Sequence, residues 1–187
     1  MSIAKTCDFL ATQRLLGYKV LSYIGNISDN KNQIELVRLM PNFKKEKMLA
    51  VLAGREMDDG LIRKYVIENG LSESVILAGF CSEMDSIWIN TDLNILLSKN
   101  DGFGLSIIEG YMRGVPSMMY DDLDAVDDVL DYGLYTLHRD SSALLNQILM
   151  IEKNTSDTKI IMKESFRYSL KQMRCSYIAA YKKLMER

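Results

Sequence analysis

The most informative stretch of the chain is Ser98-Lys99-Asn100-Asp101-Gly102-Phe103-Gly104-Leu105-Ser106-Ile107-Ile108-Glu109-Gly110. An apolar strand pattern precedes it, a helical pattern follows, and Gly102 and Gly104 allow the tight turn between them. The start of a helix presents unpaired backbone N–H groups and a partial positive charge, which suit a phosphate. In an open parallel sheet this turn lies at the carboxyl edge of the strands, where ligands bind. Asp101 and Glu109 flank it, so their carboxylates can accept hydrogen bonds from sugar or ribose hydroxyls.

Short β-rich apolar runs alternate with longer amphipathic segments on both sides of this stretch. The pattern predicts strands over residues 20–24, 48–53, 75–78, 93–97, 117–120 and 134–137, and helices over 31–40, 60–69, 82–89 and 105–113. Such alternation predicts an α/β fold, a Rossmann-like parallel sheet flanked by helices. Ser28 or Asp29 is expected to cap the first of these helices, and Pro41 to end it.

Helical patterns also occupy both ends of the chain. Residues 3–16 read as a helix stopped by Gly17, and residues 141–151 and 159–186 read as two helices separated by a break at 154–157. We expect the C-terminal helices to wrap back over the sheet. The prediction is one domain over residues 1–187, with a core over 18–140 and C-terminal helices over 141–187.

The composition fits a globular domain and argues against a nucleic-acid binder. The 187 residues are 48% hydrophobic and 26% charged, and the 23 basic and 25 acidic side chains give a net charge of −2. Nucleic-acid binding rests on clustered Lys and Arg that neutralise phosphates. No apolar run reaches the roughly 18 residues of a membrane span, and the first residues lack the apolar stretch of a signal peptide. We therefore expect a cytoplasmic protein.

Metal ligands are few and scattered. The three cysteines have no C-x-x-C spacing and His138 is the only histidine, so the sequence predicts no zinc site. The cysteines are expected to be small buried or half-buried side chains, and His138 and Trp88 to be structural. Asp122 and Asp124 form a D-x-D pair, a pattern seen in metal-dependent transferases, but acids are common at helix starts, and we predict no metal.

The quoted stretch and its surroundings resemble the donor-binding C-terminal half of GT-B glycosyltransferases, specifically glycosyltransferase family 4. The hallmark of that family is a Glu, seven residues and a second Glu, and here Asp101 and Glu109 occupy those positions. The resemblance covers residues 20 to about 128. It includes the first-strand loop 25–31, the strand and turn 75–80, and the residues 114–116 after the helix.

The resemblance implies a retaining, metal-independent hexosyl transfer from a UDP- or GDP-linked sugar to a glycan or lipid-linked acceptor, with no further cofactor. It implies that Glu109 binds the ribose, Asp101 the transferred sugar and Lys31 the diphosphate; these three are the implied catalytic residues. Donor-binding positions carried over in the same way are Gly25, Asn26, Lys31, Phe80, Gly102, Phe103, Gly104, Leu105 and Glu109.

Two residues depart from the family pattern. Asn26 stands where the family usually has Arg, so Lys31 is left as the single cation on the diphosphate unless Arg55 takes the missing role. Loss of one such electrostatic partner commonly costs on the order of 10²-fold in rate. Asp101 keeps the charge of the family's first Glu but is one methylene shorter, which changes its reach.

The acceptor half of a GT-B enzyme is the largest missing part. Residues 1–17 are far too short for a domain of roughly 100 to 200 residues. We expect a separate acceptor-binding polypeptide, with any contact with the inner membrane face made through the acceptor. The alternative is a non-catalytic nucleotide-sugar-binding or assembly subunit. A response-regulator-like domain, suggested by the Asp clusters, is a weaker candidate because matching Lys and Thr positions are lacking.

Overall fold

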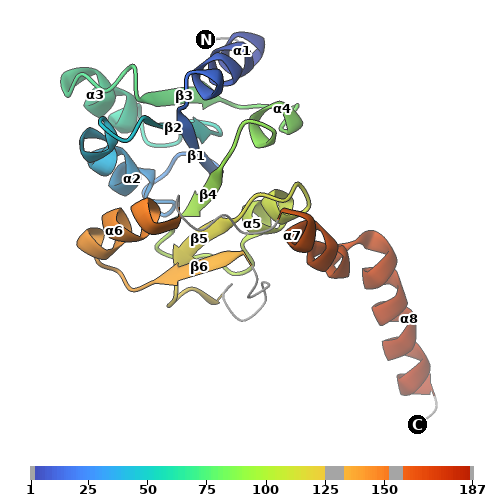
Figure 1. The fold of residues 1–187 in the computed structure, drawn as a ribbon. Coiled ribbons are helices and arrows are strands. Elements are labelled where there is room, and N and C mark those ends of the chain that lie inside the picture. The colour runs from blue at the N-terminus through green and yellow to red at the C-terminus, as the bar shows by residue number, and fades with distance from the viewer. Residues whose placement is uncertain (1–2, 125–132, 152–157, 186–187) are drawn as a thin grey trace.

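The computed structural model describes residues 3–124, 133–151 and 158–185, and it confirms the α/β fold (Figure 1). Six parallel strands form one sheet in the order β3-β2-β1-β4-β5-β6. The strands are β1 (Lys19–Ile24), β2 (Met48–Ala53), β3 (Val75–Gly79), β4 (Leu93–Leu96), β5 (Ser117–Tyr120) and β6 (Leu134–Leu137). Each lies within a residue or two of its predicted position.

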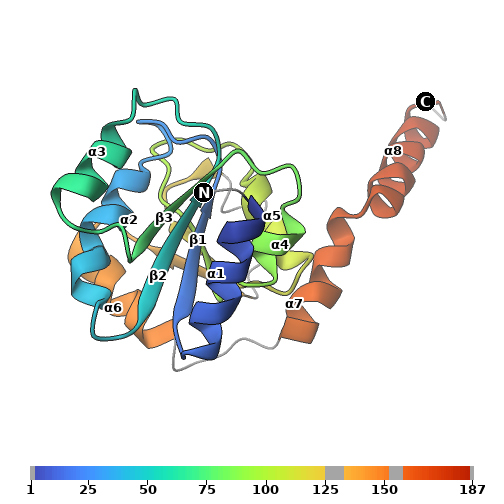
Figure 2. The ribbon, with the colours of Figure 1, turned by 90° about the horizontal axis from the view of Figure 1, so that it is seen from above.

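Helices cover both faces of the sheet, with α2, α3 and α6 on one face and α1, α4 and α5 on the other (Figure 2). The helices are α1 (Ile3–Leu15), α2 (Gln33–Leu39), α3 (Leu61–Glu68), α4 (Asp85–Trp88), α5 (Leu105–Tyr111), α6 (Ser141–Ile151), α7 (Thr158–Ser165) and α8 (Leu170–Met185), with 3₁₀ turns η1 (Met40–Phe43) and η3 (Phe166–Tyr168). The chain winds from β1 to β3 on one side and from β4 to β6 on the other. The strand order therefore reverses between β1 and β4.

The strands are apolar on both faces because both faces are covered. All six residues of β2 are buried. Its alternate residues Ala50 and Leu52 pack in the cluster that includes α2 and α3, whereas Leu49 and Val51 pack with Leu10 of α1 in a second cluster. This explains why the strands read as continuous apolar runs in the sequence.

The start of α2 differs from the prediction. The helix begins at Gln33, and its N-cap position is Asn32, whose φ of 54° is left-handed, rather than Ser28 or Asp29. The Ser28 hydroxyl instead accepts a hydrogen bond from the Lys31 N–H at 3.3 Å, so it stabilises the preceding loop. At its other end α2 stops before Pro41, but the 3₁₀ turn η1 carries the chain through this proline.

Two further helices differ in length from their predictions. The helix α4 covers four residues instead of 82–89. The continuous helix predicted over 159–186 is divided into α7 and α8 by η3 and by Ser169, which has an extended backbone. The break predicted at 154–157 lies outside the described residues.

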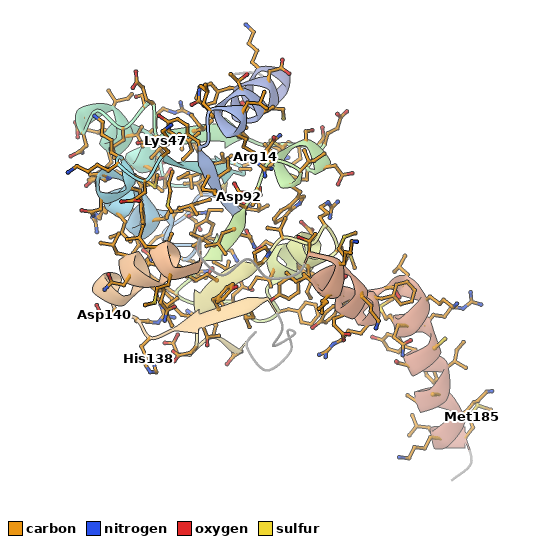
Figure 3. The ribbon with its side chains drawn as sticks, viewed as in Figure 1. Arg14, Lys47, Asp92, His138, Asp140 and Met185 are labelled. Atoms are coloured by element: carbon orange, nitrogen blue, oxygen red, sulfur yellow. The ribbon has the colours of Figure 1, made fainter. Side chains whose placement is uncertain are left out.

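The prediction that the C-terminal helices wrap over the sheet is right for α6, which lies on one face (Figure 2). It is wrong for α8, and α7 packs against α5 beside the sheet. In α7, Ile161 is fully buried. All sixteen residues of α8 are exposed, Cys175 among them, and the helix projects away from the body with Met185 near its tip (Figure 3). No helix in the described part of the chain is both long and apolar enough to cross a membrane.

Candidate functional site

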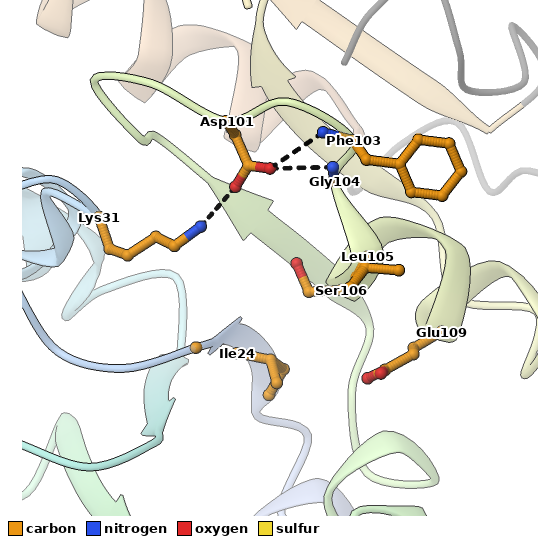
Figure 4. Close-up of a pocket in the computed structure, with 9 residues that line it drawn as sticks. Ile24, Lys31, Asp101, Phe103, Gly104, Leu105, Ser106 and Glu109 are labelled. Atoms are coloured by element: carbon orange, nitrogen blue, oxygen red, sulfur yellow. Dashed lines mark hydrogen bonds and ion pairs between the residues drawn. The ribbon is translucent and has the colours of Figure 1, made fainter.

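A pocket of about 300 Å³ lies between the carboxyl ends of β1 and β4, where the strand order reverses (Figure 4). One wall comes from the end of β1 and the loop that follows it, and the other from the β4–α5 loop and α5. The lining residues are Ile24, Gly25, Lys31, Asp101, Phe103, Gly104, Leu105, Ser106 and Glu109. Crevices at such reversal points are where open α/β sheets bind ligands.

Lys31 and Asp101 meet across this pocket. The Lys31 Nζ lies 2.5 Å from the Asp101 Oδ2, and only 28% and 13% of the two side chains are exposed. The other carboxylate oxygen accepts hydrogen bonds from the N–H groups of Gly104 at 2.9 Å and Phe103 at 3.4 Å. Burial raises the pKa of Asp101, but these hydrogen bonds and the lysine charge outweigh it, so the pKa lies below its ordinary value.

The backbone N–H groups around the start of α5 fall into two sets, one bound to Asp101 and one facing the pocket. Gly104 holds a left-handed backbone, with φ 66°, at the N-cap. Asp101 already takes the N–H groups of Phe103 and Gly104. Leu105 and Ser106 are the first residues of the helix, so their N–H groups have no partner within it. Both residues line the pocket, where these donors can meet an anion.

Glu109 lies on the second turn of α5, across the pocket from the ion pair of Lys31 and Asp101 (Figure 4). Its side chain is exposed, and its carboxylate points toward the space beside Ile24. The two carboxylates predicted to act together therefore face one pocket from different sides, separated by the turn and the first helical residues.

Hydrogen bonds join the two loops that form the pocket. The Asn30 carbonyl accepts the Lys99 N–H at 2.7 Å, and the Asn30 side-chain amide donates to the Asn100 carbonyl at 3.1 Å. The Lys99 ammonium lies 2.6 Å from the Asp29 carboxylate. Together with the pair of Lys31 and Asp101, these bonds make the two loops one connected unit.

The buried Tyr23 side chain also links the two sides of this unit. Its fully buried hydroxyl donates to the Lys31 carbonyl and accepts the Leu97 N–H at 2.7 Å. Burial raises the pKa of this hydroxyl, which keeps it a neutral donor. A tyrosine near the end of a buried strand, just before a loop, was the available sequence signal for this role.

The chain just after β1 approaches the chain just after β2 closely, and this contact requires glycine at both positions. A Cβ on Gly54 would lie 2.0 Å from the Gly25 carbonyl oxygen. Gly25 itself has φ 144°, which side chains rarely adopt. The ends of β1 and β2 can therefore meet only when these positions lack side chains.

Three of the predicted donor-binding residues do not line the pocket. Asn26 is exposed, and its carbonyl accepts a hydrogen bond from the Gln33 side chain at 3.0 Å. Gly102 is exposed in the β4–α5 loop. Phe80 is 60% exposed, and the Arg55 guanidinium lies 4.8 Å from its ring centroid. Arg55 thus stacks on Phe80, and it is not among the residues that line the pocket.

Two of the acids after β5, Asp121 and Asp122, contact basic side chains, and Asp124 is exposed. Asp122 pairs with Arg139 at 2.6 Å, and Asp121 pairs with His138 at 2.5 Å. His138 is 92% exposed, so it has no core role. Among the described residues, no group of three or more His, Cys, Asp or Glu side chains is placed to hold a metal ion.

Residues 10–165 match the family described as Glycosyl transferases group 1. The chain belongs to this family. Poly(glycerol-phosphate) alpha-glucosyltransferase of Bacillus subtilis (strain 168) is 29% identical over 160 residues, which cover 83% of this chain and 24% of that protein. GDP-mannose:cellobiosyl-diphosphopolyprenol alpha-mannosyltransferase of Xanthomonas oryzae pv. oryzae (strain PXO99A) is 28% identical over 109 residues, or 55% of this chain and 29% of that protein. The chain thus spans about a quarter of these relatives' length.

Solved structures, including two that are named as glycosyltransferases, share the fold. The Anabaena protein HepE in complex with UDP and glucose superposes with a TM-score of 0.76 at 16% identity, over 96% of this chain and 55% of that one. A glycosyltransferase from Rickettsia africae ESF-5 gives 0.81 at 14% identity, over 97% and 52%. The C-terminal domain of LpcC from Francisella tularensis, a glycosyl transferase group 1 family protein, gives 0.61 at 21%, over 79% and 80%. The sheet and its helices are therefore those of the GT-B Rossmann-like fold.

Proposed function

We propose that this chain is the donor-binding half of a GT-B glycosyltransferase of the family 4 type, and that its pocket takes a UDP- or GDP-linked hexose. The observation that carries the proposal is the pocket at the β1–β4 reversal, which combines one lysine, two carboxylates and the first N–H groups of a helix. The HepE structures, with UDP and glucose or with UDP-glucose, support this class of ligand.

The pocket offers different chemistry at its two sides. Lys31 and the N–H groups of Leu105 and Ser106 suit the diphosphate, because they supply positive charge and unpaired donors. Asp101, beside Lys31, suits the hydroxyls of the transferred sugar. Glu109, across the pocket, suits the ribose hydroxyls. This assignment agrees with the roles that the family resemblance implies for the three residues.

Donor binding requires Lys31 to change partners. In the unliganded chain its ammonium is held by Asp101. A diphosphate carries more negative charge than one carboxylate and would compete for this ammonium, which frees one Asp101 oxygen for a sugar hydroxyl. We propose that Lys31 and the helix N–H groups then stabilise the charge on the departing diphosphate, with retention at the sugar and without a metal ion.

The acceptor belongs to a separate polypeptide in this proposal. The chain covers about half of the solved glycosyltransferases of the same fold, which is consistent with one half of a two-domain enzyme. We place the protein in the cytoplasm, and any membrane contact at a lipid-linked acceptor. The name of the Xanthomonas relative contains such an acceptor, a diphosphopolyprenol.

The test is calorimetric titration of the intact chain with UDP, GDP, UDP-glucose and GDP-mannose. We expect one of the two nucleotide series to bind, and Glu109→Gln to weaken that binding about tenfold or more, as the loss of a hydrogen bond to a charged group does. Glu68→Gln on the exposed surface of α3 is the matched control. Absence of binding at millimolar ligand, or equal affinity of Glu109→Gln and the wild type, would contradict the proposal.

A second candidate function is a non-catalytic nucleotide-sugar-binding or assembly subunit. The observation that favours it is Asn26, which is exposed outside the pocket and leaves Lys31 as the single Lys or Arg among the lining residues. Transfer assays with and without a co-purified partner protein separate the two functions. Sugar transfer that requires Asp101 and Lys31 supports the enzyme, whereas donor binding without transfer in either preparation supports the subunit.

A further inference from the structure

We propose that Arg139 is a positioning residue of the donor site, because its guanidinium fixes the backbone of the loop that carries Asp101. The inference rests on the proposed function of the pocket, which Arg139 does not itself line. Arg139 follows β6, two strands away from β4, so neither its place in the sequence nor the family resemblance connects it with the site.

Arg139 contacts the loop that carries Asp101, a residue that lines the pocket. Its Nη2 donates to the carbonyl oxygens of Ser98 at 3.2 Å and Lys99 at 3.0 Å. Its Nε donates to the Asp122 carboxylate at 2.6 Å. The two carbonyls belong to the loop between β4 and α5, two and three residues before Asp101. One guanidinium therefore ties that loop to the end of β6 and to the segment after β5.

The guanidinium is itself held in one orientation. It lies 4.5 Å from the centroid of the buried Tyr120 ring. Burial raises the pKa of the Tyr120 hydroxyl, and the negative charge of Glu35 on α2 raises it further. Glu35 in turn accepts a hydrogen bond at 2.6 Å from the side-chain amide of Asn32, the neighbour of Lys31. The guanidinium is thus fixed by the Asp122 carboxylate, the Tyr120 ring and two carbonyls of the loop that carries Asp101.

The β4–α5 loop is consequently held from two sides. Asn30 binds it from the β1 side through Lys99 N–H and the Asn100 carbonyl. Arg139 binds it from the β6 side. A lysine cannot replace this arginine, because a single ammonium lacks the planar fork that serves a carboxylate and backbone carbonyls together. If charge alone mattered, Arg139→Lys would retain the effect.

Arg14 is a matched control at the opposite edge of the sheet. It binds one carboxylate and one backbone carbonyl, Asp92 at 3.0 Å and Ile89 at 2.7 Å, whereas Arg139 binds one carboxylate and two carbonyls. Figure 3 labels Arg14 and Asp92. The exposed fractions of the two arginine side chains are 37% for Arg14 and 36% for Arg139. Arg14 joins α1 to the start of β4, far along the strands from the pocket. The two arginines therefore have similar exposure and similar kinds of partner, but they hold opposite ends of the sheet.

The experiment compares Arg139→Lys, Arg139→Ala and Arg14→Lys by amide hydrogen exchange and by UDP and GDP titration. We expect both Arg139 variants to speed exchange of residues 98–104 about tenfold in the unliganded chain, by making local opening of the loop easier. We expect them to weaken nucleotide binding about tenfold and to melt at the same temperature as Arg14→Lys, which leaves loop exchange and affinity unchanged.

Wild-type exchange and affinity in both Arg139 variants would overturn the inference, as would equal effects from Arg14→Lys. Retention of both properties by Arg139→Lys alone would overturn the part that depends on the arginine fork. The exchange measurement needs no ligand, so it decides on loop positioning even if the wild type binds no nucleotide. Failure of the wild type to bind would instead contradict the proposed function.

Discussion

The loops at the carboxyl edge of the sheet and the helix α8 differ in whether their side chains have partners within the chain. In the loops, even charged groups have partners within the chain: Lys31 with Asp101, Lys99 with Asp29, and Arg139 with Asp122. In α8, large apolar side chains remain exposed, with exposed fractions between 45% for Ile178 and 86% for Met185. The difference indicates that the sheet and its loops form their site with contacts of their own, to which α8 adds little.

The largest expected effect breaks the central ion pair of the loops. Lys31→Ala should weaken binding of the nucleoside diphosphate by about 10- to 100-fold, because one hydrogen bond between charged groups is lost. Lys99→Ala is the matched control, since Lys99 belongs to the same joined loops but pairs with the exposed Asp29. Titration calorimetry measures both. Equal losses in the two variants would mean that general positive charge, not Lys31, attracts the ligand.

A somewhat smaller effect, on stability, is expected when the Tyr23 hydroxyl that links the two loops is removed. Tyr23→Phe leaves the Leu97 N–H and the Lys31 carbonyl without the hydroxyl between them. We expect the free energy of unfolding to fall by about 1–3 kcal/mol, as measured by urea denaturation. Tyr65→Phe serves as the control, because its ring contacts Arg38 near the surface of α3. An unchanged midpoint for Tyr23→Phe would show that the loops do not depend on this hydroxyl.

Acid should remove the contribution that the Asp101 carboxylate makes to the free energy of unfolding. The pKa of Asp101 is lowered in the folded chain from an ordinary value of 3.8. Its ionised form therefore stabilises the fold above that pH, and the contribution disappears as the pH falls through the lowered pKa. The unfolding free energies of the wild type and Asp101→Asn should differ most above the ordinary pKa of 3.8 and converge as the pH falls through the lowered pKa of Asp101. A difference that grows toward acid would have the wrong sign.

The smallest effect is expected from removal of α8. Deletion of residues 170–187 should change the free energy of unfolding by less than about 0.5 kcal/mol, because the described part of the helix buries no side chain against the body. Nucleotide affinity should also stay the same. A loss of stability above about 1 kcal/mol would show that α8 contributes to the fold despite its exposure.

The sequence predicted the sheet well because its signals are local. Buried parallel strands read as short apolar runs, and all six were found within a residue or two. The turn at Gly102 and Gly104 and the flanking acids placed the pocket at the correct edge. Helix ends were harder to predict. Ser28 or Asp29 was expected to cap the first helix after β1, whereas the N-cap position is Asn32, with a left-handed backbone.

Contacts between distant residues were beyond sequence reasoning. Arg139 and Ser98 are 41 residues apart and meet only because β6 lies two strands from β4. The contact of the Arg55 guanidinium with the Phe80 ring was likewise not predicted. The amphipathic pattern of α8 predicted a helix correctly, yet it carried no information on whether another part of the chain covers the apolar face.

The most direct test of the account is mapping of amide chemical shifts during titration of the intact chain with UDP and with GDP. The account predicts that one nucleotide shifts the amides of Gly25, Lys31 and residues 102–109 in a saturable manner, and that Glu109→Gln reduces the affinity of this response. Saturable shifts that centre on another surface, or spectra unchanged at millimolar concentrations of both nucleotides, would contradict it.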